Sequence, residues 1–302
     1  MTYYMFSFSV AGLAPEGKRS PGWWSRRHCL DLEPFVPTPR SGVPSPCLRR
    51  SKLTIVHCSS RFAVPSGTTM QVLTGHIASV TCGRWTPDGK KVVTCSEDST
   101  FILWDPRDGS VIHKLVASDA RFNLDDGINC LSINPTSTVA ILGGAAGGIR
   151  AVSLNAGQVL AQMQGHAEGS SVEAIAYSEV PIVGAASVVV IVSVATDGRV
   201  CTWEANTFKL RATGTHEDAV TSLAFSPGTT TFVTGSADKT VKMWDYRTGA
   251  CLKTMLGHRD VIHGCAMSND GKLVISGGED GTVKSFRPDE VESAGPPVAM
   301  EE

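Results

Sequence analysis

Four residue types recur along this chain at fixed distances, and this spacing restricts the possible folds more than any other feature of the sequence. His216 is followed by Thr234 after eighteen residues, by Asp238 after a further four and by Trp244 after a further six. The same order recurs three times: at His76, Thr94, Asp98 and Trp104, at His258, Ser276, Asp280 and Phe286, and with a longer first half at His166, Ser193, Asp197 and Trp203. Self-similarity with a period of about 40 residues indicates an array of similar units that stack to bury a shared core.

The stretch 213–255 contains every part of one such unit. Apolar and polar residues alternate in four short runs, which read AVTSLAFS, TFVTGSA, VKMWDY and CLKTML. Turn-forming residues separate these runs at 227–228, 237–238 and 247–249. Alternation bounded by turn residues is typical of antiparallel strands, so each unit is predicted to be a four-stranded sheet.

These repeats resemble those of the WD-repeat family. The resemblance is carried by Gly-His pairs before the first strand and Trp-Asp pairs at the end of the third, found at Gly75-His76, Gly165-His166, Gly257-His258, Trp104-Asp105 and Trp244-Asp245. It implies an all-β fold, a WD-repeat β-propeller of five four-stranded blades in a closed ring or an open arc. It also implies a structural network in which the indole donates to the hydroxyl, the hydroxyl to His and His to Asp. Asp238, His216 and Thr234 are then blade architecture rather than a hydrolase triad, and no enzyme activity is expected.

A further repeat, from INCLSIN to AVSL, keeps the strand pattern but has lost the polar residues. Leu142, Ala146 and Val152 occupy the places of the Ser or Thr, the Asp and the Trp. We therefore predict a degenerate blade at this position.

Composition divides the 302-residue chain unevenly. Residues 1–69 contain nine Lys or Arg against three Asp or Glu, whereas residues 70–302 contain eighteen against twenty-six. We predict an irregular, Pro-rich, basic extension at 1–61, the repeats at 62–288 and a polar tail at 289–302. Because the repeat register begins near Phe62, in mid-blade, a closed ring requires Met70 to Thr74 to act as the outer strand beside the one that holds Phe286.

The nine cysteines stand singly and form no Cys-x-x-Cys pair. This usage favours neither a zinc site nor a disulfide framework, and we expect no metal, no cofactor and a reducing compartment, the cytoplasm or alternatively the nucleus. The apolar opening segment is too short to span a bilayer, and no membrane association is predicted.

Within the WD-repeat family, the sequence resembles the angio-associated migratory cell protein group, which includes a fungal ribosome-assembly chaperone. The most specific points are the GHAEGSSVEA segment and the repeat that lacks His. The resemblance covers roughly 62–288 and implies that these repeats correspond to the last five of eight blades. It also implies a monomeric chaperone-like factor that binds the basic segment of a newly made large-subunit ribosomal protein.

Acidic residues in the loops offer a counterpart to such a basic partner. The loops before first strands and between second and third strands open on one face, and they carry Glu97, Asp125, Asp126, Glu168, Glu217 and Glu279. A group of carboxylates attracts a basic peptide and disfavours specific nucleic-acid binding.

Two other interaction roles remain open at this stage. Trp104-Asp105-Pro106-Arg107 and Trp244-Asp245-Tyr246-Arg247 match the WDxR box of cullin-type ubiquitin ligase substrate receptors, although WDxR is also ordinary repeat consensus. A generic signalling scaffold is the other alternative. An enzyme is disfavoured because no metal-ligand spacing, phosphate-binding loop or paired carboxylates stand outside the network.

Overall fold

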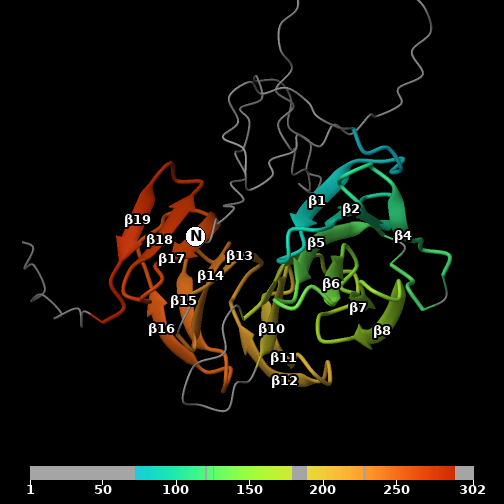
Figure 1. The fold of residues 1–302 in the computed structure, drawn as a ribbon. Coiled ribbons are helices and arrows are strands. Elements are labelled where there is room, and N and C mark those ends of the chain that lie inside the picture. Colours follow the sequence, from blue (N-terminus) through green and yellow to red (C-terminus); the bar gives the residue numbers. More distant parts are fainter. Residues whose placement is uncertain (1–71, 120, 125, 179–188, 227–228, 290–302) are drawn as a thin grey trace, which may run out of the picture. The chain divides into compact units, whose positions relative to one another are not determined.

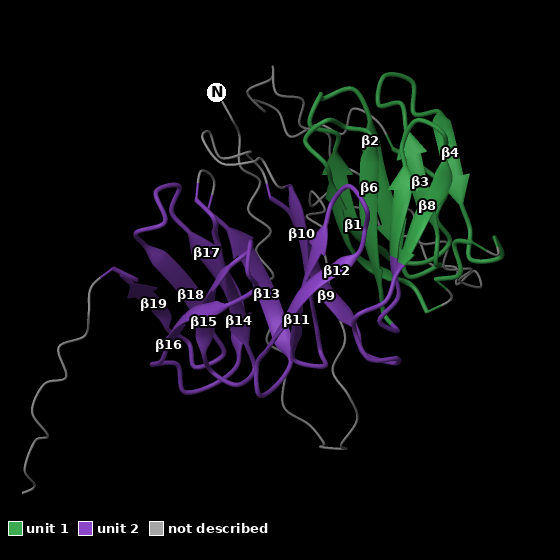
Figure 2. Ribbon diagram, turned by 90° about the horizontal axis from the view of Figure 1, so that it is seen from below, with its two compact units in different colours: residues 1–145, 150–162 green, residues 146–149, 163–302 purple. Residues whose placement is uncertain are grey.

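The computed structural model describes residues 72–119, 121–124, 126–178, 189–226 and 229–289, and within them all regular structure is β-sheet. Nineteen strands form five antiparallel sheets (Figure 1), which confirms the all-β prediction. The chain divides into two compact units, residues 1–145 with 150–162 and residues 146–149 with 163–302 (Figure 2).

The first unit holds two four-stranded sheets. The first sheet consists of β1 (Val80–Trp85), β2 (Val92–Ser96), β3 (Phe101–Trp104) and β4 (Val111–Leu115). The second consists of β5 (Ile128–Ile133), β6 (Val139–Gly144), β7 (Ile149–Ser153) and β8 (Gln158–Met163). In both, each strand pairs with its neighbours in sequence, as tight turns between short alternating runs require.

The second unit holds the other three sheets. The third sheet consists of β9 (Val172–Tyr177), β10 (Val190–Ala195), β11 (Arg199–Glu204) and β12 (Leu210–Thr215). The fourth consists of β13 (Val220–Phe225), β14 (Thr231–Ser236), β15 (Val241–Asp245) and β16 (Cys251–Met255). The fifth consists of β17 (Ile262–Met267), β18 (Val274–Gly278) and β19 (Val283–Phe286).

Neighbouring sheets within a unit bury their apolar faces against each other. In the first unit, Ile128 and Leu131 of β5 pack with Val93, Cys95 and Phe101 of the first sheet. In the second unit, Val220 of β13 packs on the third sheet and Ile262 of β17 on the fourth. The second strands are buried over their whole length in the first and third sheets.

Glycine closes the turn between third and fourth strands where the backbone demands it. Gly249 has a φ of +71°, and a Cβ at this position would lie 2.4 Å from the Cβ of Ala212. Gly109 occupies the same turn of the first sheet with a φ of +76°. Only glycine adopts this backbone conformation without strain, so these residues fix where the fourth strand begins.

The fifth sheet differs from the prediction. Among the described residues it has three strands rather than four, and residues 72–76 form no strand, so the predicted outer strand at Met70 to Thr74 is not found there. Met70 and Gln71 lie outside the described residues, as do 1–61, 290–302 and the apolar stretch 179–188 between β9 and β10.

Candidate functional site

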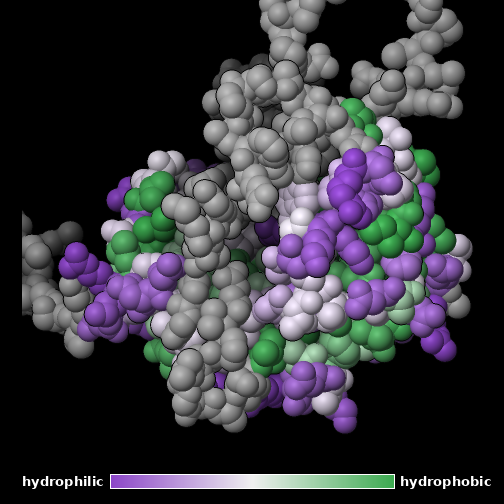
Figure 3. Space-filling view, in the orientation of Figure 1, coloured by the Kyte–Doolittle hydropathy of each residue, from purple (hydrophilic) through white to green (hydrophobic). Residues whose placement is uncertain are grey.

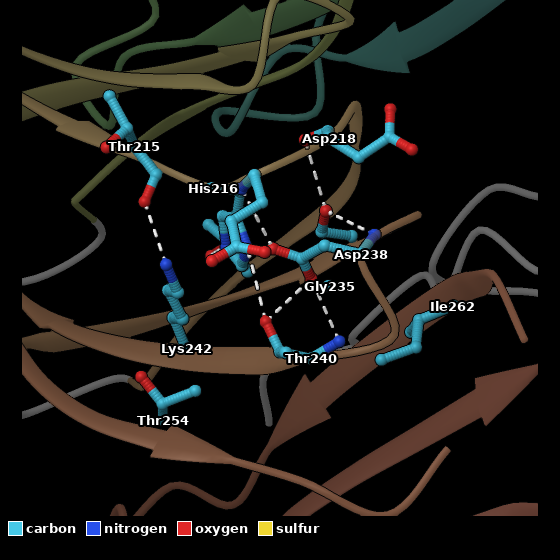
Figure 4. A network of polar contacts seen from close by, with 12 residues as sticks. Thr215, His216, Asp218, Gly235, Asp238, Thr240, Lys242, Thr254 and Ile262 are labelled. Carbon is cyan, nitrogen blue, oxygen red and sulfur yellow. Dashed lines mark hydrogen bonds and ion pairs between the residues drawn. The ribbon is translucent and has the colours of Figure 1, made fainter. Parts of the chain in front are cut away.

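A chain of hydrogen bonds links the second and third strands of the fourth sheet to the loop that precedes its first strand (Figure 4). The indole N–H of Trp244 donates to Thr234 Oγ1 over 2.8 Å. Thr234 Oγ1 lies 2.7 Å from His216 Nε2, and His216 Nδ1 lies 2.8 Å from Asp238 Oδ2. Because the indole can only donate, the hydroxyl gives its own proton to Nε2, and Nδ1–H then donates to the carboxylate.

The carboxylate at the end of this chain also holds two backbone segments. Asp238 accepts the N–H of Glu217 over 3.1 Å and the N–H of Thr240 over 2.9 Å. The loop before β13 and the turn between β14 and β15 are therefore fixed to each other through one side chain. A buried network of this kind rigidifies the sheet because every member has a partner.

The same contacts recur in three other sheets at the positions predicted from the spacing. His76 lies 2.7 Å from Thr94, and His166 and His258 lie 2.8 Å and 2.7 Å from Ser193 and Ser276. The indoles of Trp104 and Trp203 donate to Thr94 and Ser193, and Asp98, Asp197 and Asp280 accept the backbone N–H that follows each His, from Ile77, Ala167 and Arg259.

Two of these networks deviate from the fourth sheet. His76 Nδ1 lies closer to Thr100 Oγ1, at 2.7 Å, than to Asp98 Oδ1, at 3.4 Å. In the fifth sheet Phe286 replaces the Trp, so Ser276 receives no indole proton there.

Burial sets the electrostatics of the networks. Desolvation lowers the pKa of His76, His166 and His216 below 6.5 and outweighs the opposing effect of their carboxylates, so these rings stay neutral. Burial alone would raise the pKa of Asp238, but hydrogen bonds from Thr240 and His216 outweigh it and lower this pKa to about 2. Neutral His beside ionised Asp is the state that the hydrogen-bond directions require.

The triad-like geometry does not provide a nucleophile. Thr234 is fully buried, and its hydroxyl is already engaged by Trp244 and His216. A catalytic hydroxyl must reach a substrate, and this one cannot. The arrangement links the strands of the sheet to the loop before it.

The degenerate blade is the second sheet, and apolar contacts replace its polar network. Leu124 stands eighteen residues before Leu142, where the other repeats have His, and both are buried in one cluster with Val152. The tie between loop and sheet is made instead by Arg150, whose Nε donates to the carbonyl of Phe122 over 2.8 Å and whose Nη2 donates to that of Asn123 over 2.9 Å. Neither Leu124 nor Arg150 was among the residues predicted from the repeat spacing.

The described members of the predicted acidic set are all exposed and lie in the predicted loops. Glu97 and Asp126 lie at the same end of the two sheets of the first unit, where the backbone of Gly127 approaches that of Glu97. Glu168 and Glu217 precede the first strands of their sheets in the second unit, and Glu279 lies between β18 and β19. Asp125 lies outside the described residues.

The same loops also carry basic residues, which were not part of the predicted acidic set. Lys239 and Arg259 are exposed beside Asp238 and before β17, and His263 Nε2 lies 3.6 Å from Glu279 Oε2. The loops of the second unit are therefore acidic in balance but mixed in sign.

Within the described residues, no three His, Cys, Asp or Glu side chains are grouped to hold a metal ion, and the six cysteines there form no disulfide. The described part of the chain also contains no helix of the length and apolar character needed to cross a membrane.

Comparison with known proteins agrees with this architecture. The family model "WD domain, G-beta repeat" matches residues 67–105, 208–245 and 249–287. Each match spans the end of one predicted blade and three strands of the next. The second sheet, without its polar network, and the third, with its longer first half, are not matched. The chain is a WD-repeat protein, and WD40 repeats are generally non-catalytic scaffolds that bind other proteins.

Two longer proteins are similar to this chain over most of its length. The chain is 33% identical over 226 residues to an uncharacterized WD repeat-containing protein of Schizosaccharomyces pombe, covering 72% of this chain and 54% of that protein. It is 30% identical over 238 residues to the human angio-associated migratory cell protein, covering 75% of this chain and 53% of the relative. The chain thus spans about half the length of these relatives. A shorter match, 41% identical over 69 residues, is to the denticleless protein homolog of Danio rerio, covering 22% of this chain and 11% of that protein.

Proposed function

We propose that this WD-repeat protein is a chaperone-like factor in ribosome biogenesis, which binds the basic segment of a newly made large-subunit ribosomal protein. The proposal is supported by the similarity to the angio-associated migratory cell protein and by the exposed carboxylates in the loops at one end of the sheets. Cysteines that form no disulfide among the described residues suit a reducing compartment, so we propose the cytoplasm, with the nucleus as the alternative.

The single observation that carries the proposal is the exposure of Glu97, Glu217 and Glu279. All three project from loops at the end of a sheet where the first strand begins and the second ends. Exposed carboxylates in such loops of each unit attract a Lys- and Arg-rich peptide at long range and raise its association rate. They repel the phosphates of a nucleic acid by the same field.

We expect the triple variant Glu97→Lys, Glu217→Lys and Glu279→Lys to bind such peptides more weakly. Synthetic peptides with the sequences of basic N-terminal segments of large-subunit ribosomal proteins serve as probes. The association rate at low salt should fall by about tenfold or more, and the difference should shrink at high salt because ions screen exposed charges. Surface plasmon resonance at two ionic strengths measures both effects.

A matched control places the same change of charge at the other end of the sheets. Asp108 and Asp270 are exposed in turns between third and fourth and between first and second strands, and the exposed Glu204 is the last residue of the third strand β11. Their reversal to Lys should leave the association rate within about twofold of the wild type, because the added charge lies away from the binding loops. Equal losses in the two triple variants would contradict the assignment of the loops, and no binding by the wild type would contradict the proposed partner.

A second candidate function, a substrate receptor of a cullin-type ubiquitin ligase, rests on Arg107. Its side chain is 86% exposed and is held by two hydrogen bonds to Asp105, of 3.0 Å and 2.6 Å, so the guanidinium is presented in one orientation. Affinity purification separates the two functions: recovery of a ligase adaptor that is lost in Arg107→Ala supports this candidate, and recovery of a ribosomal protein supports the first.

A further inference from the structure

Three cysteines lie on neighbouring strands of the first unit. Cys82 belongs to β1, Cys95 to β2 and Cys130 to β5, so their contacts are formed within that unit. Cys95 is fully buried in the apolar cluster that the first two sheets share, and Cys82 packs against that cluster. Figure 3 shows hydrophobic and hydrophilic surface intermixed over the first unit, whereas the cluster between its sheets is apolar.

The strand register places two of these thiols directly opposite each other. Cys82 of β1 pairs with Cys95 of β2 in the antiparallel ladder. Opposite residues in such a ladder point to the same face, and their Cα atoms lie about 4.5–5.5 Å apart. A disulfide joins Cα atoms that are about 4.4–6.8 Å apart, so the backbone spacing already suits a bond. The two thiols are also hydrogen-bonded to each other.

Two opposed thiols are found at this place in the first sheet alone among the described residues. The equivalent pairs in the other sheets are Cys130 with Gly143, Ala174 with Val194, Ser222 with Gly235, and Gly264 with Gly277. A buried thiol can act simply as a small apolar side chain. The other four sheets fill this place without a pair of sulfurs, so packing alone does not account for the pair.

We propose that Cys82 and Cys95 form a reversible redox pair, which hydrogen peroxide converts into a disulfide between β1 and β2 of the folded chain. In a reducing compartment, protein disulfides are usually transient and serve catalysis or redox sensing. The pair lies in the core of the first unit, and the acidic loops take no part in it. The inference is therefore independent of the proposed ribosomal partner.

The oxidation proceeds in two balanced steps. The thiolate of Cys82 attacks one oxygen of peroxide, the O–O bond breaks, and the products are a sulfenic acid and hydroxide, which takes up the proton that the thiol released and becomes water. Cys95 Sγ then attacks the sulfenic sulfur, the S–O bond breaks, and the Cys95 proton leaves with the hydroxyl as a second water. The two thiols lose two electrons, and peroxide accepts both. An added dithiol reverses the bond by exchange.

Burial determines which thiol reacts first. Desolvation raises the pKa of Cys95 well above its usual range, and the hydrogen bond with Cys82 acts in the same direction. Because the thiolate is the nucleophile, Cys95 is a poor first target for peroxide. Cys82 is therefore oxidised first and Cys95 resolves the sulfenic acid. Cys130 also lies near enough to raise the pKa of Cys95, so it is the competing resolving thiol that the test must distinguish.

Peptide mapping of the full chain tests the pairing. The reduced protein is treated with hydrogen peroxide, alkylated and digested without reductant. We expect the linked peptides of Cys82 and Cys95 to exceed any other cysteine pair by about tenfold or more, because thiols held in contact react at a high effective concentration. Dithiothreitol should remove the link. The urea-denatured chain is the control, since its nine cysteines pair at random and the preference should vanish.

Two substitutions separate the roles of the two thiols. In Cys95→Ser the sulfenic acid on Cys82 lacks its resolving thiol, so dimedone should trap it there, whereas in Cys82→Ser dimedone should leave Cys95 unmodified. Cys251→Ser is the matched control, because Cys251 lies on β16 of the second unit and its removal should leave the link unchanged. A native chain without the Cys82–Cys95 link would overturn the proposal. So would a link from Cys82 to Cys130 in its place, a preference that persists in urea, or no dimedone adduct on Cys82 in Cys95→Ser.

Discussion

At the scale of single residues, the sequence was most informative where one side chain has one geometric role. Trp, Ser or Thr, His and Asp at fixed spacing predicted a hydrogen-bonded chain, and His216, Thr234, Asp238 and Trp244 form it. The direction of each bond follows from which groups can only donate, and this needs no knowledge of the partner sheets.

The same reasoning missed Arg150 because its role depends on burial. On the sequence it is a charged residue in a strand, which usually faces water. In the fold it is 7% exposed and binds backbone carbonyls in place of the missing His and Asp. The spacing could have pointed to Leu124, which stands eighteen residues before Leu142.

We expect Asp238→Ala to destabilise the chain by about 1–3 kcal/mol, because it leaves His216 Nδ1–H and the N–H of Glu217 without an acceptor. The denaturant midpoint measures this loss. The exposed Asp218, in the loop before β13 that also holds His216 and Glu217, is the control. Asp218→Ala should change the free energy of unfolding by about 0.5 kcal/mol or less. Equal effects of the two substitutions would show that the network contributes nothing specific.

At the scale of strands and sheets, prediction succeeded where turn residues bound an alternating run. The four runs predicted in 213–255 became β13, β14, β15 and β16 with ends displaced by one residue at most. The predicted outer strand of the fifth sheet lies partly outside the described residues, and residues 72–74 form no strand. A strand at an edge exists only if a partner edge is brought beside it, and local alternation does not determine that.

The second sheet tests whether Arg150 substitutes for the polar network. Arg150→Leu should cost about 1–3 kcal/mol of stability, because it leaves the buried carbonyl of Phe122 without its donor. Lys242 occupies the same register position in the fourth sheet and donates to the Thr215 carbonyl over 2.9 Å (Figure 4), but it is half-exposed.

Lys242→Leu is therefore the matched control for Arg150→Leu. Water can reach the Thr215 carbonyl when the Lys is removed, and we expect a loss of about 0.5 kcal/mol or less. Thermal unfolding of the two variants side by side compares them. If Arg150→Leu were as mild as Lys242→Leu, the guanidinium would not be the tie that holds the loop before β5.

At the scale of the whole molecule, the buried histidines make stability a function of pH. His76 belongs to the first unit and His166 and His216 to the second, and burial lowers the pKa of each below 6.5. The unfolded chain therefore binds more protons than the folded one in the interval between the lowered values and 6.5. Stability must rise with pH in that interval.

We expect the free energy of unfolding to be maximal above pH 7 and to fall as the pH drops from 6.5 through the lowered His pKa values. The slope is at most about 1.4 kcal/mol per pH unit for each proton, so three rings give a steep decline. The carboxylate of Asp238, with a pKa of about 2, stays ionised throughout this window and adds its own loss only in stronger acid.

Denaturant titrations between pH 5 and about 8 measure the slope. His216→Gln should reduce the slope of the free energy of unfolding against pH by up to the contribution of one proton, because one titrating ring is gone while the others remain. A stability that is constant between pH 5 and 7, or a slope unchanged by His216→Gln, would contradict neutral buried histidines in the folded chain.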